Sequence, residues 1–306
     1  MYIQDLILEI TRDCNMNCWF CLRGEPEKVK MCSALFPSIF EGITGIGCLT
    51  ITGGEPTLYP QFFKDLELYM KHSGITIRVF YIKTNGLIRC TTLVEFSDFL
   101  AGYITDEALH PMLEISLDND RDGIPPDTYD WWRKQMETRP YIGFDDKRGA
   151  IYNHIAEGRA EEFYDPDPPR DTRLTPQEWL NFNSRRTTYS RLKDVEWTLE
   201  NDTDSCEDAR LEGWAYVNAK GGVTFYCDFS YESQEKYLLG SVKENTLKSI
   251  LLNPDTAVKV NQFKQEAELL YQASGVGNNI LSHVTTECEV MQMFEPLPIQ
   301  FFTQYD

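Results

Sequence analysis

The chain has 306 residues, 42% of them hydrophobic and 13% aromatic, which is enough to build one large core or two modest ones. Its 29 Lys and Arg residues stand against 48 Asp and Glu residues, so the formal charge is −19, and such a field disfavours nucleic acid and anionic membranes as partners. The sequence has no apolar run of about 18 residues and no basic segment followed by an apolar one at its N-terminus. We therefore expect a cytoplasmic protein with no membrane partner.

Three of the nine cysteines, Cys14, Cys18 and Cys21, fall within eight positions. An odd number of thiols cannot all pair in disulfides, and crowding of this kind is typical of metal or cluster ligation in a reducing compartment. A four-iron cluster that only carries electrons is held by four thiolates. With only three thiolates, one iron of such a cluster has no cysteine ligand and can bind a small molecule. The group of three cysteines therefore indicates a catalytic site.

Short apolar runs alternate with helical patterns through the first 118 residues. Such alternation predicts right-handed βαβ crossovers and a parallel sheet, with ligands bound at the C-terminal ends of the strands. The first strand leads directly into the cysteine segment. The strands are expected over residues 6–10, 49–52, 75–82 and 112–117, and the helices over 37–43, 61–72 (closed by Ser73-Gly74) and 92–100.

Four short motifs stand at the ends of these strands. In the first, an aromatic residue, Phe20, directly precedes the third cysteine. The others are Gly53-Gly54-Glu55-Pro56, Thr84-Asn85-Gly86 and Ile115-Ser116-Leu117-Asp118. In this order the four resemble the motifs of the radical S-adenosylmethionine (radical SAM) superfamily, and together they cover roughly residues 5–118.

The resemblance implies an α/β fold, a partial (β/α)6 TIM-like barrel with a smaller α+β C-terminal domain. It implies a 4Fe-4S cluster on Cys14, Cys18 and Cys21, with SAM bound at the open iron. Cleavage of SAM would give a 5′-deoxyadenosyl radical that abstracts hydrogen from a substrate, and the electrons would come from a flavodoxin or ferredoxin type donor. The residues implied to contact SAM are Phe20, Gly53, Gly54, Glu55, Pro56, Thr84, Asn85, Ser116 and Asp118.

The residue types suit these roles. Gly53 and Gly54 lack a Cβ, so the backbone can pass close to a ligand, and Glu55 offers an acceptor to an ammonium group. Ser116 and Asp118 are two positions apart on a strand, so both can face the mouth of a barrel. The alternatives are an ordinary turn for the glycine segment and a capped strand end for Ser116 and Asp118.

Beyond Asp118 the pattern weakens. Residues 127–137 indicate a helix in which Trp131 and Trp132 are packing residues. Residues 145–205 form a polar stretch that we interpret as an insertion or an ordered loop, with a helix start at Thr175-Pro176. Residues 195–199 favour a late barrel strand.

The last third of the chain, residues 206–306, is expected to form a second domain after a barrel of residues 1–205. Residues 214–217 and 223–226 flank a turn at Lys220-Gly221-Gly222 and predict a β-hairpin, and a helix is expected over 246–252, ending near Asn253-Pro254. This arrangement resembles the truncated auxiliary-cluster domain, called a twitch or SPASM-like domain, of many radical SAM enzymes.

The remaining cysteines leave two alternatives open. Cys206, Cys227 and Cys288 would either hold a second iron-sulfur cluster in the C-terminal domain or be ordinary buried thiols. Cys32, Cys48 and Cys90 are expected to be thiols of the core.

The rival to a radical SAM enzyme is a non-catalytic zinc or iron-sulfur interaction module, because zinc also accepts thiolates. For the enzyme, the substrate is a peptide or a small molecule. The first strand starts about six residues from Met1, so we expect no leader-recognition domain before it. A peptide would then need a separate recognition protein or capture by residues 145–205.

Overall fold

The structure is a computed structural model, and it describes residues 1–18, 21–104, 111–116, 123–145, 197–200, 209–227 and 229–273, with side chains up to Glu266. Several predictions lie outside these residues: the roles of Phe20, Asp118, Cys206 and Cys288, and the helix start at Thr175.

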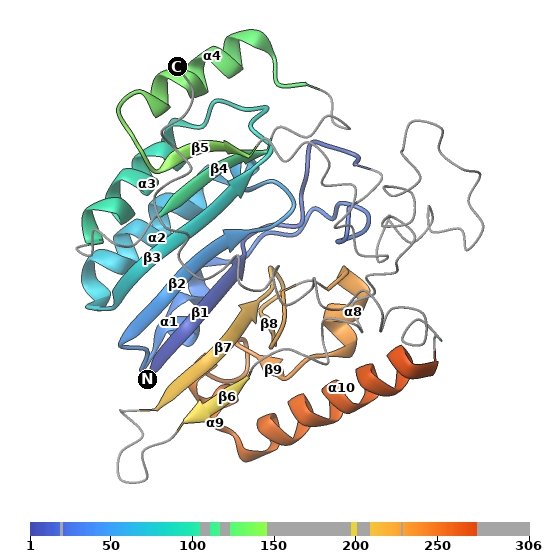
Figure 1. The fold of residues 1–306 in the computed structure, drawn as a ribbon. Helices are drawn as coiled ribbons and strands as arrows, with labels where there is room; N and C mark the ends of the chain where they lie inside the picture. Colours follow the sequence, from blue (N-terminus) through green and yellow to red (C-terminus); the bar gives the residue numbers. More distant parts are fainter. Residues whose placement is uncertain are drawn as a thin grey trace, which may run out of the picture.

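One sheet of nine strands runs through the described part of the chain (Figure 1). Six neighbouring strands are parallel, as the alternating pattern predicted, and among the described residues the sheet does not close into a barrel. In spatial order they are β5 (Ile142–Asp145), β4 (Met112–Ser116), β3 (Thr76–Thr84), β2 (Gly45–Thr52), β1 (Tyr2–Glu9) and β7 (Arg210–Val217). The expected α/β fold with six parallel strands is therefore confirmed. These strands form an open sheet in the described part of the chain.

The sixth parallel strand comes from an unexpected part of the chain. β7 pairs in parallel with β1, so residues predicted for the C-terminal domain share a sheet with the barrel strands. The strand predicted over 195–199 is wrong as a barrel strand. β6 (Thr198–Glu200) is a three-residue strand that pairs antiparallel with β7 and not with a parallel strand.

Helices α1 (Phe36–Phe40), α2 (Pro60–Ser73) and α3 (Thr91–Tyr103) cover one face of the sheet (Figure 1). Buried Phe80, Ile82 and Thr84 alternate with half-buried residues in β3, as period two requires, whereas the last four residues of β1 and of β4 are all buried. Helix α2 begins at a proline and ends before Gly74, whose left-handed backbone (φ 67°) closes it as predicted.

Short elements complete this half of the molecule. The 3-10 helices are η1 (Ser33–Leu35) and η2 (Pro56–Leu58), and α4 (Pro126–Met136) follows β4 in the chain. The predicted packing role of Trp132 is confirmed, since its side chain is fully buried and its indole N–H donates to the Gly86 carbonyl at 2.9 Å.

The C-terminal strands extend the same sheet, and the predicted β-hairpin is confirmed. β8 (Gly222–Thr224) forms a hairpin with β7, and β9 (Gly240–Ser241) pairs with β8. Helices α8 (Tyr231–Lys236), α9 (Leu247–Leu252) and α10 (Pro254–Ala273) pack beside them. The sequence analysis did not predict α10, although Pro254 suits its first position. A cluster of aromatic side chains forms the core here: Phe225, Phe229, Tyr237 and Phe263.

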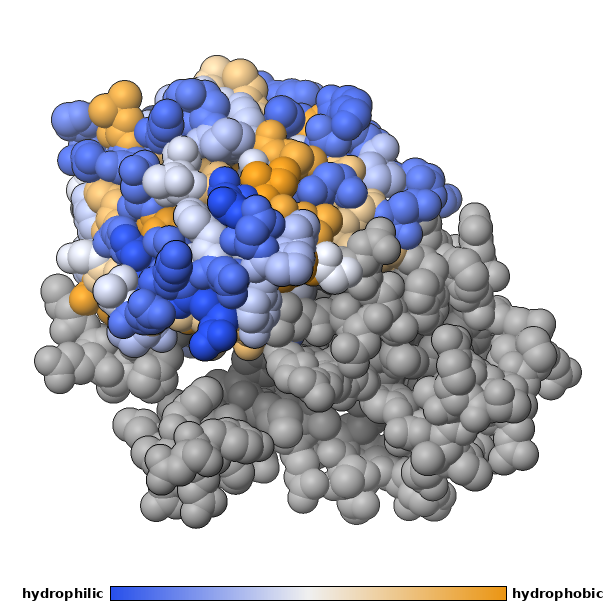
Figure 2. Space-filling view, turned by 90° about the horizontal axis from the view of Figure 1, so that it is seen from above, coloured by the Kyte–Doolittle hydropathy of each residue, from blue (hydrophilic) through white to orange (hydrophobic). Residues whose placement is uncertain are grey.

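In the view of Figure 2 the described surface is mainly hydrophilic, and apolar residues are exposed at several separate places on it. Among the described helices, none combines the length and the hydropathy needed to cross a lipid bilayer.

Helix α2 offers a matched test of the core. Leu66 is fully buried, whereas Leu68 is 62% exposed. We expect Leu66→Ala to lower the free energy of unfolding by about 2–5 kcal/mol, because a buried cavity remains, and Leu68→Ala to change it by about 0.5 kcal/mol or less. Urea denaturation measures both, and equal losses in the two variants would contradict the packing described here.

Candidate functional site

Cys14, Cys18 and Cys21 lie in residues 11–18 and 21–30, the described parts of a long loop that we call the cysteine loop. It leaves β1 and returns antiparallel to itself: Arg12 N–H donates to the Val29 carbonyl at 2.9 Å, and Met31 N–H donates to the Ile10 carbonyl at 2.9 Å. The loop starts at the C-terminal end of β1, where a parallel sheet places its ligands.

Cys14, Cys18 and Cys21 are half-buried. Burial raises the pKa of the Cys14 thiol, and the nearby Glu55 carboxylate and the other two thiols raise this pKa further. No three His, Cys, Asp or Glu side chains within the described ranges converge closely enough to share one metal ion. A four-iron cluster engages each thiolate through a different iron, so three soft sulfur donors spread along one loop fit such a group.

Gly53 and Gly54 bring the end of β2 against the cysteine loop. Gly54 N–H donates to the Thr11 carbonyl at 2.6 Å, and Glu55 N–H donates to the Asp13 carbonyl at 2.8 Å. A Cβ on Gly54 would lie 2.3 Å from the Asp13 oxygen, so only glycine allows this approach. The close contact that the structure shows is therefore with the loop backbone, and contact with a ligand stays a prediction.

The Glu55 side chain is 1% exposed and holds two strand ends together. Its Oε1 accepts from Thr57 N–H at 3.0 Å, from the Thr57 hydroxyl at 2.6 Å and from the Thr84 hydroxyl at 2.6 Å. Its Oε2 accepts from Asn85 N–H at 2.8 Å. Since a carboxylate oxygen can accept about two hydrogen bonds, Oε2 is the better placed of the two atoms to take a further donor.

Asn85 connects the third motif to the first. Its side-chain amide donates to Asn15 Oδ1 on the cysteine loop at 2.8 Å. Gly86 follows with φ 71°, a left-handed conformation that glycine adopts readily. Pro56 is the first residue of η2 and is buried. Three of the four motifs thus meet at adjacent strand ends, and Ser116, the described part of the fourth, lies buried at the end of β4.

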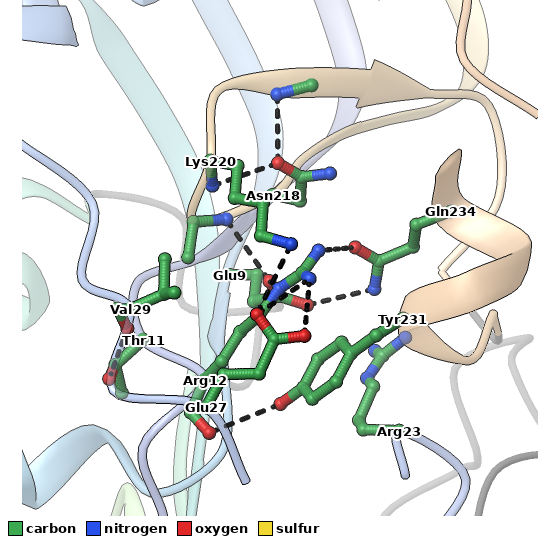
Figure 3. Close-up of polar contacts among 12 residues, drawn as sticks. Glu9, Thr11, Arg12, Arg23, Glu27, Val29, Asn218, Lys220, Tyr231 and Gln234 are labelled. Carbon is green, nitrogen blue, oxygen red and sulfur yellow. Dashed lines mark hydrogen bonds and ion pairs between the residues drawn. The ribbon is translucent and has the colours of Figure 1, made fainter. Parts of the chain in front are cut away.

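Sequence analysis missed a buried ion pair beneath the loop, Glu9 and Arg12, which Figure 3 shows. Both side chains are fully buried, and Arg12 Nε donates to Glu9 Oε1 at 2.9 Å. Glu9 also accepts from the Tyr216 hydroxyl at 2.6 Å and from Ala219 N–H at 3.1 Å. The sequence signal for this pair is a charged residue at the end of an apolar strand, Glu9, and one of opposite charge three positions later, Arg12. The same pattern is typical of a solvent-exposed loop, so it does not predict a buried pair.

The surroundings of Glu9 keep its carboxylate ionised. Burial alone raises the pKa of Glu9, but the guanidinium groups of Arg23 and Arg12 and the hydrogen bonds from Tyr216 and Gln234 outweigh burial, so its pKa is lowered overall. The same burial raises the pKa of Tyr216 far above its ordinary value, so this residue stays a hydroxyl donor.

The segment after β8 lies against the cysteine loop. Arg23 Nη1 donates to the carbonyls of Cys227 and Phe229 at 2.6 and 2.5 Å, and Tyr231 N–H donates to the Arg23 carbonyl at 3.0 Å. The backbone of Cys227 is therefore in direct contact with Arg23, which follows Cys21 by two residues.

A second group that sequence analysis missed lies on the sheet face opposite α2 and α3. Lys83 Nζ is 2.9 Å from Asp145 Oδ2 and 3.4 Å from Glu114 Oε2, and the Tyr81 hydroxyl also bonds Glu114. These residues form a polar row across β3, β4 and β5 near the strand ends.

The three other described thiols differ from one another. Cys90 is buried, as expected for a core thiol. Cys48 is half-buried, and its pKa is raised to about 11 by burial and by Asp5. Cys32 is exposed, so the prediction is wrong for this residue, which precedes η1 at the surface.

No protein-family model and no curated protein matches the sequence. Solved structures do match. One, described as native anSMEcpe with bound AdoMet and Cp18Cys peptide, aligns over 87% of this chain and 84% of its own, with a TM-score of 0.50 and 16% identity. The chain therefore shares the fold of this AdoMet-bound structure. SuiB of Streptococcus suis, bound to precursor peptide SuiA, aligns over 83% of this chain and 65% of its own, with a TM-score of 0.48 and 14% identity.

The glycine contact with the cysteine loop can be tested directly. We expect Gly54→Ala to lower the free energy of unfolding by about 1–3 kcal/mol, because its Cβ would clash with a backbone oxygen. Gly102→Ala is the control, since a Cβ there meets nothing within 4 Å, and we expect no loss. Urea denaturation decides, and a Gly54→Ala variant as stable as the parent would rule out the close approach.

Proposed function

We propose that this protein is a radical SAM enzyme that acts on a peptide or a small molecule. The observation that supports the proposal most directly is the joining of three motifs at adjacent strand ends. The loop that carries Cys14, Cys18 and Cys21 is hydrogen-bonded to the Gly54-Glu55 backbone and to the Asn85 side chain. A fold resemblance alone would leave the chemistry open.

In this proposal the three cysteines hold a 4Fe-4S cluster, and SAM binds beside it. When bound, the pair supplies a 5′-deoxyadenosyl radical that abstracts hydrogen from the substrate. The chain supplies binding and orientation. Glu55 Oε2 accepts from the SAM amino group, while the polar groups of Thr84, Asn85 and Ser116 orient the rest of the cofactor. We assign the same task to Gly53, Pro56, Phe20 and Asp118 from the motif resemblance.

Support for a peptide substrate comes from the anSMEcpe structure, which carries a peptide together with AdoMet. The polar row of Tyr81, Lys83, Glu114 and Asp145 lies on the open face of the sheet, near the strand ends that carry the motifs. A substrate held there would meet charged groups of both signs. We propose a flavodoxin or ferredoxin type protein as the electron donor.

The first test of this function compares two cysteines. Wild-type protein reconstituted anaerobically with iron and sulfide should be brown and, with SAM and dithionite, should release 5′-deoxyadenosine. Cys18→Ala should release none, because a cluster ligand is lost. Cys32→Ala, which removes an exposed thiol outside the motif, should behave as wild type.

Absorbance, metal analysis and chromatography of the nucleoside are the measurements. Wild-type protein that holds zinc and no iron would replace the enzyme with a zinc-binding interaction module. Unchanged 5′-deoxyadenosine release from Cys18→Ala would remove the cysteine loop from the site.

A second cluster on Cys206, Cys227 and Cys288 is a separate proposal. We expect reconstituted wild type to carry about eight irons per chain, and the combined alanine variant of Cys14, Cys18 and Cys21 to retain about four. Iron and sulfide analysis measures both. A combined variant with no residual iron would mean a single cluster and leave the other thiols with a structural role.

A further inference from the structure

Gln234 on α8 contacts both members of the buried ion pair (Figure 3). Its Oε1 accepts from Arg12 Nη2 at 2.8 Å, and its Nε2 donates to Glu9 Oε2 at 2.9 Å and is 3.3 Å from the Tyr216 hydroxyl. The Gln234 side chain is fully buried. A carboxamide has both an acceptor and donors, so it can satisfy a guanidinium and a carboxylate at once, which neither a carboxylate nor an ammonium group can do.

Arg12 transmits this contact to both arms of the cysteine loop. It lies two residues before Cys14 on the outgoing arm, and its Nη1 donates to Glu27 on the returning arm at 3.2 Å. Its guanidinium also lies 4.2 Å from the centre of the Tyr231 ring, which belongs to the same helix as Gln234. Helix α8 thus fixes the residue that ties the two arms together.

A second contact from the same part of the chain reaches the far side of the three cysteines. Arg23, two residues after Cys21, bonds the carbonyls of Cys227 and Phe229, just before α8. The segment from Cys227 to Gln234 therefore holds the loop at a residue before Cys14 and at a residue after Cys21. The contacts that Arg12 makes with Gln234 and Arg23 makes with Cys227 each span more than 200 residues of sequence, so each closes a long loop of chain at a cost in entropy.

We propose that Gln234 is a positioning residue for the cysteine loop, so that α8 is part of the site although it contributes no cysteine. The inference rests on the proposed function, in which Cys14, Cys18 and Cys21 hold one cluster. Without Gln234, Arg12 loses an acceptor and Glu9 a donor, and buried groups left without partners draw water or move. The outgoing and returning arms of the cysteine loop then separate, and Cys14, Cys18 and Cys21 are no longer held in positions from which they can bind one cluster.

The test replaces Gln234 with methionine, which has a similar volume and no hydrogen-bonding amide. Glu232→Gln, at an exposed position of the same helix, is the control. In the metal-free protein we expect amide hydrogen exchange in residues 11–18 and 21–31 to be about tenfold faster in Gln234→Met. Exchange in β2 and β3 should be unchanged, and the control should match wild type throughout.

The second readout is the electron paramagnetic resonance spectrum of the reduced, reconstituted protein with and without SAM. Gln234→Met should bind less iron and lose the spectral change that SAM causes in wild type. If Gln234→Met does not fold, Tyr216→Phe takes its place, because it removes only the hydroxyl that bonds Glu9, and the same local pattern is expected with a smaller amplitude.

Two results would overturn the inference: unchanged exchange in the loop together with a normal response to SAM, or faster exchange spread evenly over the sheet, which means a merely structural role. Failure of the proposed function looks different. If wild type binds no cluster, that function is wrong, while the exchange experiment on the metal-free protein still shows whether Gln234 orders the loop.

Discussion

The buried pair of Glu9 and Arg12 is the constraint on which this end of the molecule depends. Two opposite charges without solvent contact are stable only when their remaining polar atoms also find partners, and breaking such a pair typically costs about 3–5 kcal/mol. Here the partners come from β7, from the turn after it and from α8. The pair therefore holds the cysteine loop, the sheet and α8 in one arrangement.

A different kind of contact holds the other side of the loop. There the backbone of Gly53-Gly54 lies so close to residues 11–13 that a Cβ would clash with carbonyl oxygens. Glu55 then links the end of β2 to the end of β3 through Thr84 and Asn85. The loop is thus held by side-chain charges on one side and by backbone hydrogen bonds on the other. It can be ordered before any ligand arrives, and preorganisation of this kind lowers the cost of binding.

The sequence predicted the elements that local patterns determine. Strand alternation, the proline start and glycine end of α2, and the hairpin at Gly221 depend on neighbouring residues, so they could be read correctly. Pairings between distant segments could not. Nothing local distinguishes β7 as a parallel partner of β1, and the three residues of β6 were predicted in the wrong place. The burial of Glu9 and Arg12 could not be predicted for the same reason, because their partner Gln234 lies over 200 residues away in the sequence.

The same division explains how two chains can share a fold at 16% identity. The sheet needs only apolar residues in alternation, and the approach of the loops needs glycine at one or two backbone positions, so few side chains are specified. The contacts that do require particular residues are polar and buried, such as the carboxamide of Gln234 between two charges. On the open face, Lys83 between Glu114 and Asp145 requires three charged residues on three neighbouring strands. The fold therefore determines where the strand ends meet, while such polar contacts determine which side chains must stand at particular positions there.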